Sequence, residues 1–414
     1  MNPNDPPMAY ATAVPVNQDD YASKQQQPPP APPQSYSRAP APTAGPSTFQ
    51  PPFLSEAPDL TQHDMNVLYE QHQFTRGLST AVAKTTQDFC LRIWVVDNSG
   101  SMSTGDGTRM VQTNTGATKM ISCSRWEEIK ECVTYHASLA RDVRAPTKFR
   151  MLNPTALSKS WMSMGTCDAG CQPNDIAFGG CYNTAFDNVF KVMQRSSPGG
   201  CTPLTRHLAE IHTEIMSMKA DLEMSGRKVC IVLATDGLPS DNQGYTTEAA
   251  KSAFVNGLRA FVGLPIWVVI RLCTDEDDVC EFYNELDSQV ELNFEVIDDF
   301  KGEAKEVHEH NPWLNYGIAM HRLREWGFHD KILDLLDERK LSKGELRSFV
   351  SFLMGLEAWD VPDPAIDFQE FCIWVKANQQ NLRPVFNVLK CETQPWINIK
   401  KLKQCYDPAG CIIS

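Results

Sequence analysis

Apolar segments alternate with helix-like segments between residues 59 and 300. Four apolar runs end abruptly at polar or turn residues, which predicts buried strands at 89–97, 147–152, 228–237 and 264–272. A fifth segment, 291–298, alternates apolar and polar residues as an edge strand does. Helical periodicity is present between these strands, at 63–86, 124–143, 184–195 and 203–223. Because apolar strands separated by helices form parallel sheets covered on both faces, we predict an α/β fold with a doubly wound, mostly parallel sheet flanked by helices.

The chain divides into four predicted regions. Residues 1–58 contain 15 of the 28 prolines and predict a disordered Pro-rich tail, because this composition buries too little apolar surface to offset its ordering entropy. Residues 59–300 hold the predicted sheet. Residues 301–398 show four short amphipathic helices and no strand, which predicts a small all-α domain. Residues 399–414 are expected to form a flexible tail.

Two segments within the sheet region depart from a simple alternation of strands and helices. Residues 109–122 alternate around an Asn-Thr-Gly turn and predict a β-hairpin. The Gly- and Cys-rich stretch that ends near residue 181 predicts irregular structure. Both segments would lie close to the loops at the carboxyl ends of the strands, where they either shape the choice of partner or are inert insertions.

Composition narrows the classes of function. A formal charge of -13 argues against a nucleic-acid partner, because phosphate binding needs Lys and Arg on a common face. The chain has no apolar run of about 18 residues, and its first residues lack the order of a secretory signal. We therefore expect a cytoplasmic protein whose 14 cysteines are mostly reduced. The Pro-rich tail is either a docking segment for proline-recognising domains or a spacer.

Oxygen-bearing side chains follow three predicted elements. Asp97, Ser99 and Ser101 come directly after the first strand, Thr202 precedes a helix, and Asp236 follows the third strand. Because the carboxyl ends of parallel strands meet at one edge of the sheet, these side chains should converge there. Two carboxylates and three hydroxyls form a hard oxygen site, which suits Mg²⁺, or Mn²⁺ and Ca²⁺, and disfavours zinc and copper.

The same three segments carry a family resemblance. Asp-x-Ser-x-Ser at 97–101, Gly-Gly-x-Thr-Pro-Leu at 199–204 and Thr-Asp-Gly at 235–237 together resemble the complete metal-ion-dependent adhesion site of the von Willebrand factor type A fold. The resemblance covers roughly residues 85–300. It implies a non-enzymatic protein that binds a protein partner through a divalent metal ion.

The resemblance also implies a role for each residue of the site. Ser99 and Ser101 would ligate the metal through their hydroxyl oxygens, and Thr202 would bind it directly or through water. Asp97 and Asp236 would hold metal-bound waters, and Asp236 can also ligate directly. A Glu or Asp of the partner would complete the coordination.

An enzymatic alternative uses the same carboxylates. Phosphohydrolases of the haloacid-dehalogenase type also place an Asp at the end of the first strand and hold Mg²⁺ with later acidic residues, for which Asp97 and Asp236 are candidates. Their mechanism needs a second carboxylate two residues after the nucleophile, as general acid and base. Ser99 occupies that position, which favours binding over phosphoryl chemistry. A scaffold with an idle metal site is a further alternative.

The final residues, Cys411-Ile412-Ile413-Ser414, match a Cys-aliphatic-aliphatic-X box and resemble a farnesylation signal on Cys411. One lipid chain gives only marginal membrane residence, so a second contact is expected. Lys400, Lys401 and Lys403 form a weak basic patch, and Cys405 is either a palmitoylation site or an idle thiol. We therefore expect a peripheral protein on a cytosolic membrane face.

Overall fold

The structure is a computed structural model. It describes residues 59–113, 116–155, 161–164, 180–241 and 243–407. The predicted disordered tail and Cys411 therefore lie outside the described residues.

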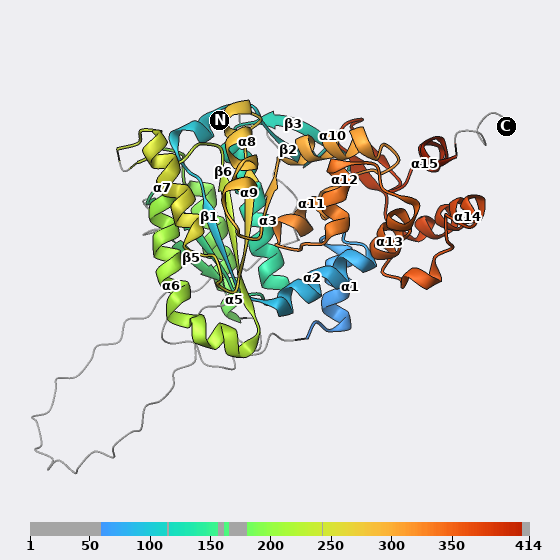
Figure 1. Cartoon of the computed structure of the whole chain (residues 1–414), viewed down its shortest axis with the longest axis horizontal. Helices are drawn as coiled ribbons and strands as arrows, with labels where there is room; N and C mark the ends of the chain where they lie inside the picture. The colour runs from blue at the N-terminus through green and yellow to red at the C-terminus, as the bar shows by residue number, and fades with distance from the viewer. Residues whose placement is uncertain (1–58, 114–115, 156–160, 165–179, 242, 408–414) are drawn as a thin grey trace, which may run out of the picture. The chain divides into compact units, whose positions relative to one another are not determined.

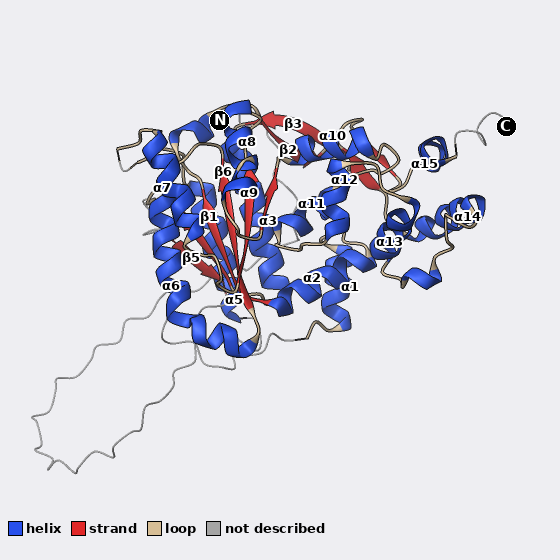
Figure 2. Cartoon of the chain, in the orientation of Figure 1, coloured by secondary structure: helices blue, strands red, loops and turns tan. Residues whose placement is uncertain are grey.

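One six-stranded sheet forms the centre of the α/β region, in the order β5-β4-β1-β6-β7-β8 (Figure 2). Five neighbouring strands run parallel, and β5 joins the edge antiparallel to β4. The strands are β1 (Phe89–Val96), β4 (Thr147–Met151), β5 (Trp161–Met164), β6 (Lys228–Thr235), β7 (Ile266–Leu272) and β8 (Phe294–Ile297). The prediction of an α/β fold with a mostly parallel sheet is thus confirmed. Strand β5 was not expected, because its four residues lie in the stretch predicted to be irregular.

Helices cover both faces of this sheet (Figure 1). Successive side chains of a strand point to opposite faces, so Trp94 of β1 packs with Val133 of α3, whereas Ile93 packs in a second apolar cluster with Leu208 of α6. Helices α7 and α8 share the second cluster with α6. The helices of this region are α3 (Arg125–Asp142), α5 (Gly180–Arg195), α6 (Leu204–Ser225), α7 (Glu248–Arg259), α8 (Asp277–Asn284) and α9 (Leu286–Gln289).

Two smaller predictions concern the segments before and after β1. The predicted hairpin is present as the antiparallel pair β2 (Gly107–Gln112) and β3 (Thr118–Cys123). The predicted helix at 63–86 is two helices, α1 (Gln62–Glu70) and α2 (Arg76–Asp88). They are separated where Gln73 adopts a positive φ of 58° and Thr75 caps the second helix.

Helices dominate the chain after residue 300. They are α10 (Phe300–His310), α11 (Ile318–Glu325), α12 (Lys331–Glu338), α13 (Lys343–Met354), α14 (Phe368–Asn378) and α15 (Ile399–Tyr406). Short 3₁₀ turns lie at η3 (Ala358–Asp360) and η4 (Gln379–Asn381). No helix in the described part of the chain is both long and apolar enough to cross a membrane.

Two expectations for the C-terminal part are corrected. The expectation of no strand after residue 300 is wrong, because β9 (Val385–Asn387) and β10 (Glu392–Gln394) form a short antiparallel pair. Strands of three residues are too short to show a periodicity. The first half of the expected flexible tail is instead helix α15, because Asn398 caps it and Leu402 is buried.

The C-terminal helices share a core with one face of the sheet. Trp326, at the end of α11, belongs to the same buried apolar cluster as Trp94 of β1 and Phe349 of α13. Its ring stacks on His136 of α3, with ring centroids 5.9 Å apart. The division into two domains at residue 300 stays a prediction.

Candidate functional site

The segments that carry the candidate metal site meet at the carboxyl edge of the sheet. Asp97 follows β1 directly and Asp236 follows β6 directly, and these two strands are neighbours in the sheet. Ser99 is the N-cap residue of the 3₁₀ helix η2 (Gly100–Ser103), and Ser101 lies within that helix. Thr202 lies two residues before the first residue of α6. The parallel topology therefore brings the loop at Asp97 next to two loops that follow it by more than 100 residues in the chain.

Asp97 is fully buried and fixed through both carboxylate oxygens. The backbone amide of Ser99 donates to Oδ1 over 2.8 Å, and the hydroxyl of Thr235 donates to Oδ2 over 2.6 Å. Asp97 therefore has a set orientation before any ligand binds.

A chain of short contacts joins the first and third segments. Oγ of Ser99 lies 3.0 Å from Oγ of Ser101, and the Ser101 hydroxyl donates to Oδ1 of Asp236 over 2.8 Å. Ser99 and Asp236 are each 2% exposed, whereas Ser101 is exposed. The cluster is thus reachable from solvent at Ser101 and enclosed behind it.

Thr202 lies beside this cluster. Its backbone amide donates to Oγ of Ser240 over 3.0 Å, and its carbonyl accepts from the Ser240 amide at the same distance. Its Oγ1 lies 3.8 Å from the position a β-carbon would take at Gly237, next to Asp236. The second segment is therefore held against the third.

The loop before Thr202 needs a glycine. Gly200 has a φ of +96°, and a β-carbon there would lie 2.5 Å from Oδ1 of Asn153. Asn153 links the segments, since its amide nitrogen Nδ2 donates to the Cys201 carbonyl and its backbone amide donates to Oδ1 of Asn98. These bonds hold the Thr202 loop beside the end of β1.

Arg125 is a site residue that the sequence analysis missed. Its guanidinium donates from Nη1 to Oδ2 of Asp236 over 3.1 Å, from Nε and Nη2 to Asp106 over 2.8 and 2.6 Å, and from Nη2 to Glu276 over 2.7 Å. A signal was present in the sequence. Arg125 is the first residue of α3, and a cation at a helix N-terminus is opposed by the helix dipole.

Burial shifts the acidity of the two central carboxyl groups. Burial and the neighbouring charge of Asp236 raise the pKa of Asp97 to about 6. Burial also raises the pKa of Asp236, against the hydrogen bonds from Ser101 and Arg125 that lower it. Two buried carboxylates that repel each other form an environment that favours a bound cation.

The donor set fits a hard divalent metal ion. The atoms that converge are carboxylate and hydroxyl oxygens, and no thiol or imidazole is bonded to them among the described residues. Oxygen ligands of this kind suit Mg²⁺, Mn²⁺ or Ca²⁺. Ser99, Ser101, Thr202, Asp97 and Asp236 are the residues that would hold such an ion, directly or through water.

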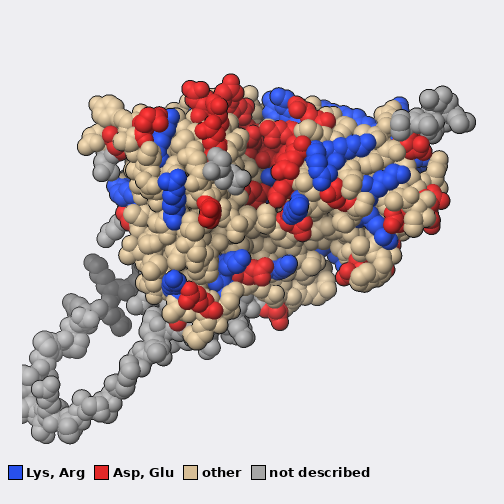
Figure 3. All heavy atoms as spheres, viewed as in Figure 1, with Lys and Arg blue, Asp and Glu red and all other residues tan. Residues whose placement is uncertain are grey.

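The rim of this site is acidic. The side chains of Asp106 and Glu276 are 50% and 61% exposed. The exposed residues Asp277 and Asp278 follow at the start of α8, where Figure 3 shows acidic side chains gathered. Negative charge therefore surrounds the cluster of hydroxyls.

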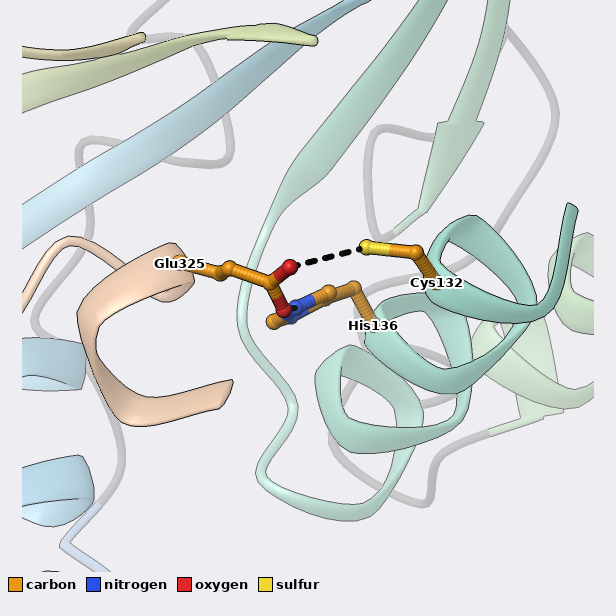
Figure 4. A group of neighbouring side chains, drawn as sticks. All are labelled: Cys132, His136 and Glu325. Carbon is orange, nitrogen blue, oxygen red and sulfur yellow. Dashed lines mark hydrogen bonds and ion pairs between the residues drawn. The ribbon is translucent and has the colours of Figure 1, made fainter. Parts of the chain in front are cut away.

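A second group of candidate metal-binding side chains lies inside the protein (Figure 4). Cys132 and His136 of α3 point toward Glu325 of α11, with Sγ and Nε2 at 3.4 and 2.9 Å from its carboxylate oxygens. Thiol, imidazole and carboxylate groups are ligands of zinc. All three side chains are fully buried.

The surroundings of this group favour an ion-pair network over a metal. Arg322 and Arg271 also donate to the Glu325 carboxylate, at 2.8 and 3.4 Å, so guanidinium groups already balance its charge. Nδ1 of His136 has no hydrogen-bond partner among the described residues, whereas a zinc-bound histidine usually donates from its second nitrogen. We assign the group to the packing of α3 against α11.

A third group consists of the carboxylates of Glu303, Glu306 and Asp337. Arg324 forms ion pairs with Glu303 and Asp337, so a guanidinium also balances charge in this group.

The predicted lipidation region is described only in part. Cys405 is half-buried in α15 with its pKa raised by burial, so it is not an activated thiol. Lys400 is exposed, and Lys401 and Lys403 are partly buried in the same helix.

Comparisons with known proteins give little. Neither a scan against protein-family models nor a search of curated proteins found a match. Among solved structures, a point mutant of the PilB minor pilin from Streptococcus sanguinis is similar at 14% identity, over 58% of this chain and 63% of that chain, with a TM-score of 0.34. The unmutated PilB minor pilin gives 13% identity over 50% and 56% of the chains, with a TM-score of 0.32. The matches span less than two thirds of either pilin chain.

Proposed function

We propose that this chain is a non-enzymatic protein that binds a protein partner through a divalent metal ion, and that its sheet region has the von Willebrand factor type A fold. The observation that carries the proposal is the hydrogen-bonded cluster of Asp97, Ser99, Ser101 and Asp236, with Thr202 beside it. Its members come from three distant segments and meet at the edge where parallel α/β sheets bind ligands.

The residues suit binding better than catalysis. Ser99 contacts Ser101 at 3.0 Å and offers a hydroxyl, not the carboxylic acid that a phosphohydrolase would need there. Mg²⁺, when bound, supplies a Lewis-acidic centre for a carboxylate. Ser101 is the exposed member of the cluster, so the partner's Glu or Asp would approach from its side.

The C-terminal box completes the proposal. A prenyl group on Cys411 would tether the chain to a cytosolic membrane face only a few residues after α15 ends at Tyr406. The exposed Lys400 lies in that last helix and adds a weak attraction to anionic lipids. The protein would then act as an adaptor near a membrane surface.

The test is partner capture with and without metal. Purified full-length chain on beads should retain partner proteins in Mg²⁺ and release them when a chelator is added. The Asp236→Ala variant should retain none of them. Retention of the same proteins by the variant and in chelator would contradict the proposal.

A further inference from the structure

Arg125 links three loops of the carboxyl edge through one buried guanidinium. Its side chain is 2% exposed, and it donates to Asp236 after β6, to Asp106 after η2 and to Glu276 after β7. The distances are 3.1 Å to Asp236, 2.6 Å for the shorter bond to Asp106 and 2.7 Å to Glu276. All three guanidinium nitrogens therefore donate hydrogen bonds, and of these only Nη1 donates to a residue of the candidate metal site.

Local helix electrostatics do not explain this arginine. Arg125 directly follows the N-cap Ser124, and a positive charge in the first turn of a helix opposes the helix dipole. The same turn also carries Glu127 and Glu128, which the dipole favours. The unfavourable position of Arg125 therefore has to be offset by the carboxylates that it contacts.

Arg125 is also unlike the other donors to the two central carboxylates. Asp97 accepts from the Ser99 amide and the Thr235 hydroxyl, and Asp236 accepts from the Ser101 hydroxyl and Arg125. A hydroxyl can rotate and present a lone pair to a cation, whereas a guanidinium has no lone pair to offer. Of these donors, only Arg125 carries a positive charge, so only Arg125 repels a metal ion.

We infer that Arg125 is a built-in counter-cation of the candidate metal site, which competes with the metal for Asp236 and keeps the affinity for the metal alone low. This inference rests on the function proposed above. The site then holds a cation firmly only when a further carboxylate arrives, which is what a partner's Glu or Asp supplies. Asp106 and Glu276 weaken this competition between Arg125 and the metal. They accept the hydrogen bonds from Nε and Nη2 of Arg125, so that only Nη1 donates to Asp236.

The test measures Mg²⁺ binding to the full chain by titration calorimetry. Removal of one positive charge next to the site should tighten binding in Arg125→Met by roughly tenfold. Arg125→Lys keeps the charge and should stay close to the wild type. A merely structural arginine would give weaker binding in both variants. Arg141→Met, which removes a charge from the other end of α3, is the matched control and should change nothing.

A second variant tests the opposite direction. Asp106→Asn combined with Glu276→Gln removes two negative charges and leaves Arg125 to bind Asp236 alone, so Mg²⁺ binding should weaken by roughly tenfold. Unchanged or tighter binding in this variant would overturn the inference. If Arg125→Met fails to fold, Arg125→Gln decides the question, because it also removes the charge and should also bind Mg²⁺ more tightly; unchanged or weaker binding in a folded Arg125→Gln variant would overturn the inference.

The outcomes separate this inference from the proposed function. Wild-type binding of Mg²⁺ that is not tightened in a folded Arg125→Met variant overturns the role of Arg125 and leaves the metal site intact. Absence of Mg²⁺ binding in the wild type and in Arg125→Met overturns both. Binding that is measurable only in Arg125→Met supports both.

Discussion

The hydroxyl of Thr235 donates a 2.6 Å hydrogen bond to Oδ2 of Asp97, and both side chains are fully buried. The bond joins the last residue of β6 to the residue that follows β1. Thr235→Val removes the donor and leaves a buried carboxylate oxygen unsatisfied, so the free energy of unfolding should fall by about 2 kcal/mol. Chemical denaturation measures the loss. Mg²⁺ binding should weaken as well, because Asp97 loses its fixed orientation.

A threonine of equal size provides the control. Thr213 is exposed on α6 and donates its hydroxyl to the Ala209 carbonyl over 2.9 Å. Thr213→Val should change the stability by no more than about 0.5 kcal/mol. Equal losses in the two variants would show that the Thr235 hydroxyl has no special role.

The conformation of the Thr202 loop depends on Gly200, and the adjacent Gly199 provides a matched control. Gly200→Ala places a β-carbon against the Asn153 side chain at a positive φ, so we expect a loss of about 1–3 kcal/mol in stability and weaker Mg²⁺ binding. Gly199→Ala meets nothing within 4 Å and should keep wild-type stability. Denaturation and calorimetry on both variants check this. Equal behaviour of the two would contradict the role of this turn.

His136 makes the fold sensitive to acid. Burial lowers its pKa from 6.5 to about 4, although the nearby Glu325 acts to raise it. Because the unfolded chain then binds a proton more readily than the folded one, stability should fall as the pH drops below about 6.5 and level off below about 4. The loss from this group amounts to at most roughly 3 kcal/mol.

Denaturation midpoints across this pH range test the assignment. The His136→Gln variant should be less stable at neutral pH and should show a flatter dependence on pH. His63→Gln, at an exposed histidine of α1, should keep the wild-type dependence. A steep dependence that survives in His136→Gln would assign the acid sensitivity to other groups.

The predicted anchor is tested in cells. A fluorescent fusion that leaves the C-terminus free should be partly on membranes, and Cys411→Ser should move it entirely to the cytosol, because no prenyl group can be attached. Cys391→Ser, at an exposed cysteine outside the box, is the control. Identical distributions of the wild type and the Cys411 variant would refute the anchor.

The sequence predicts those secondary-structure elements that are long enough to show a pattern of apolar residues. Strands β1, β6 and β7 are mostly apolar segments of seven or eight residues, although Arg92 and Arg271 interrupt β1 and β7. Their parallel order follows from the helices between them. The site residues Asp97 and Asp236 follow from the same argument, since each stands directly after such a strand. Strands β9 and β10 have three residues each, too few for a pattern.

Contacts between distant residues are harder to predict. Arg125 bonds Asp236 and Glu276 across 111 and 151 residues of sequence, and Thr235 bonds Asp97 across 138. Only the register of β1 against β6 and the approach of α3 bring these atoms together. The cation in the first turn of α3 was the one local sign, since it conflicts with the helix dipole.

Calorimetric titration of the full-length chain with Mg²⁺ tests the central claim most directly. We expect the wild type to bind Mg²⁺ and Asp97→Ala and Asp236→Ala to lose binding, while Asp187→Ala, at an exposed aspartate of α5, keeps it. Asp97→Asn, which keeps the size of the side chain, serves if the alanine variant does not fold. Mg²⁺ binding that is unchanged in folded variants at both Asp97 and Asp236 would contradict the metal site.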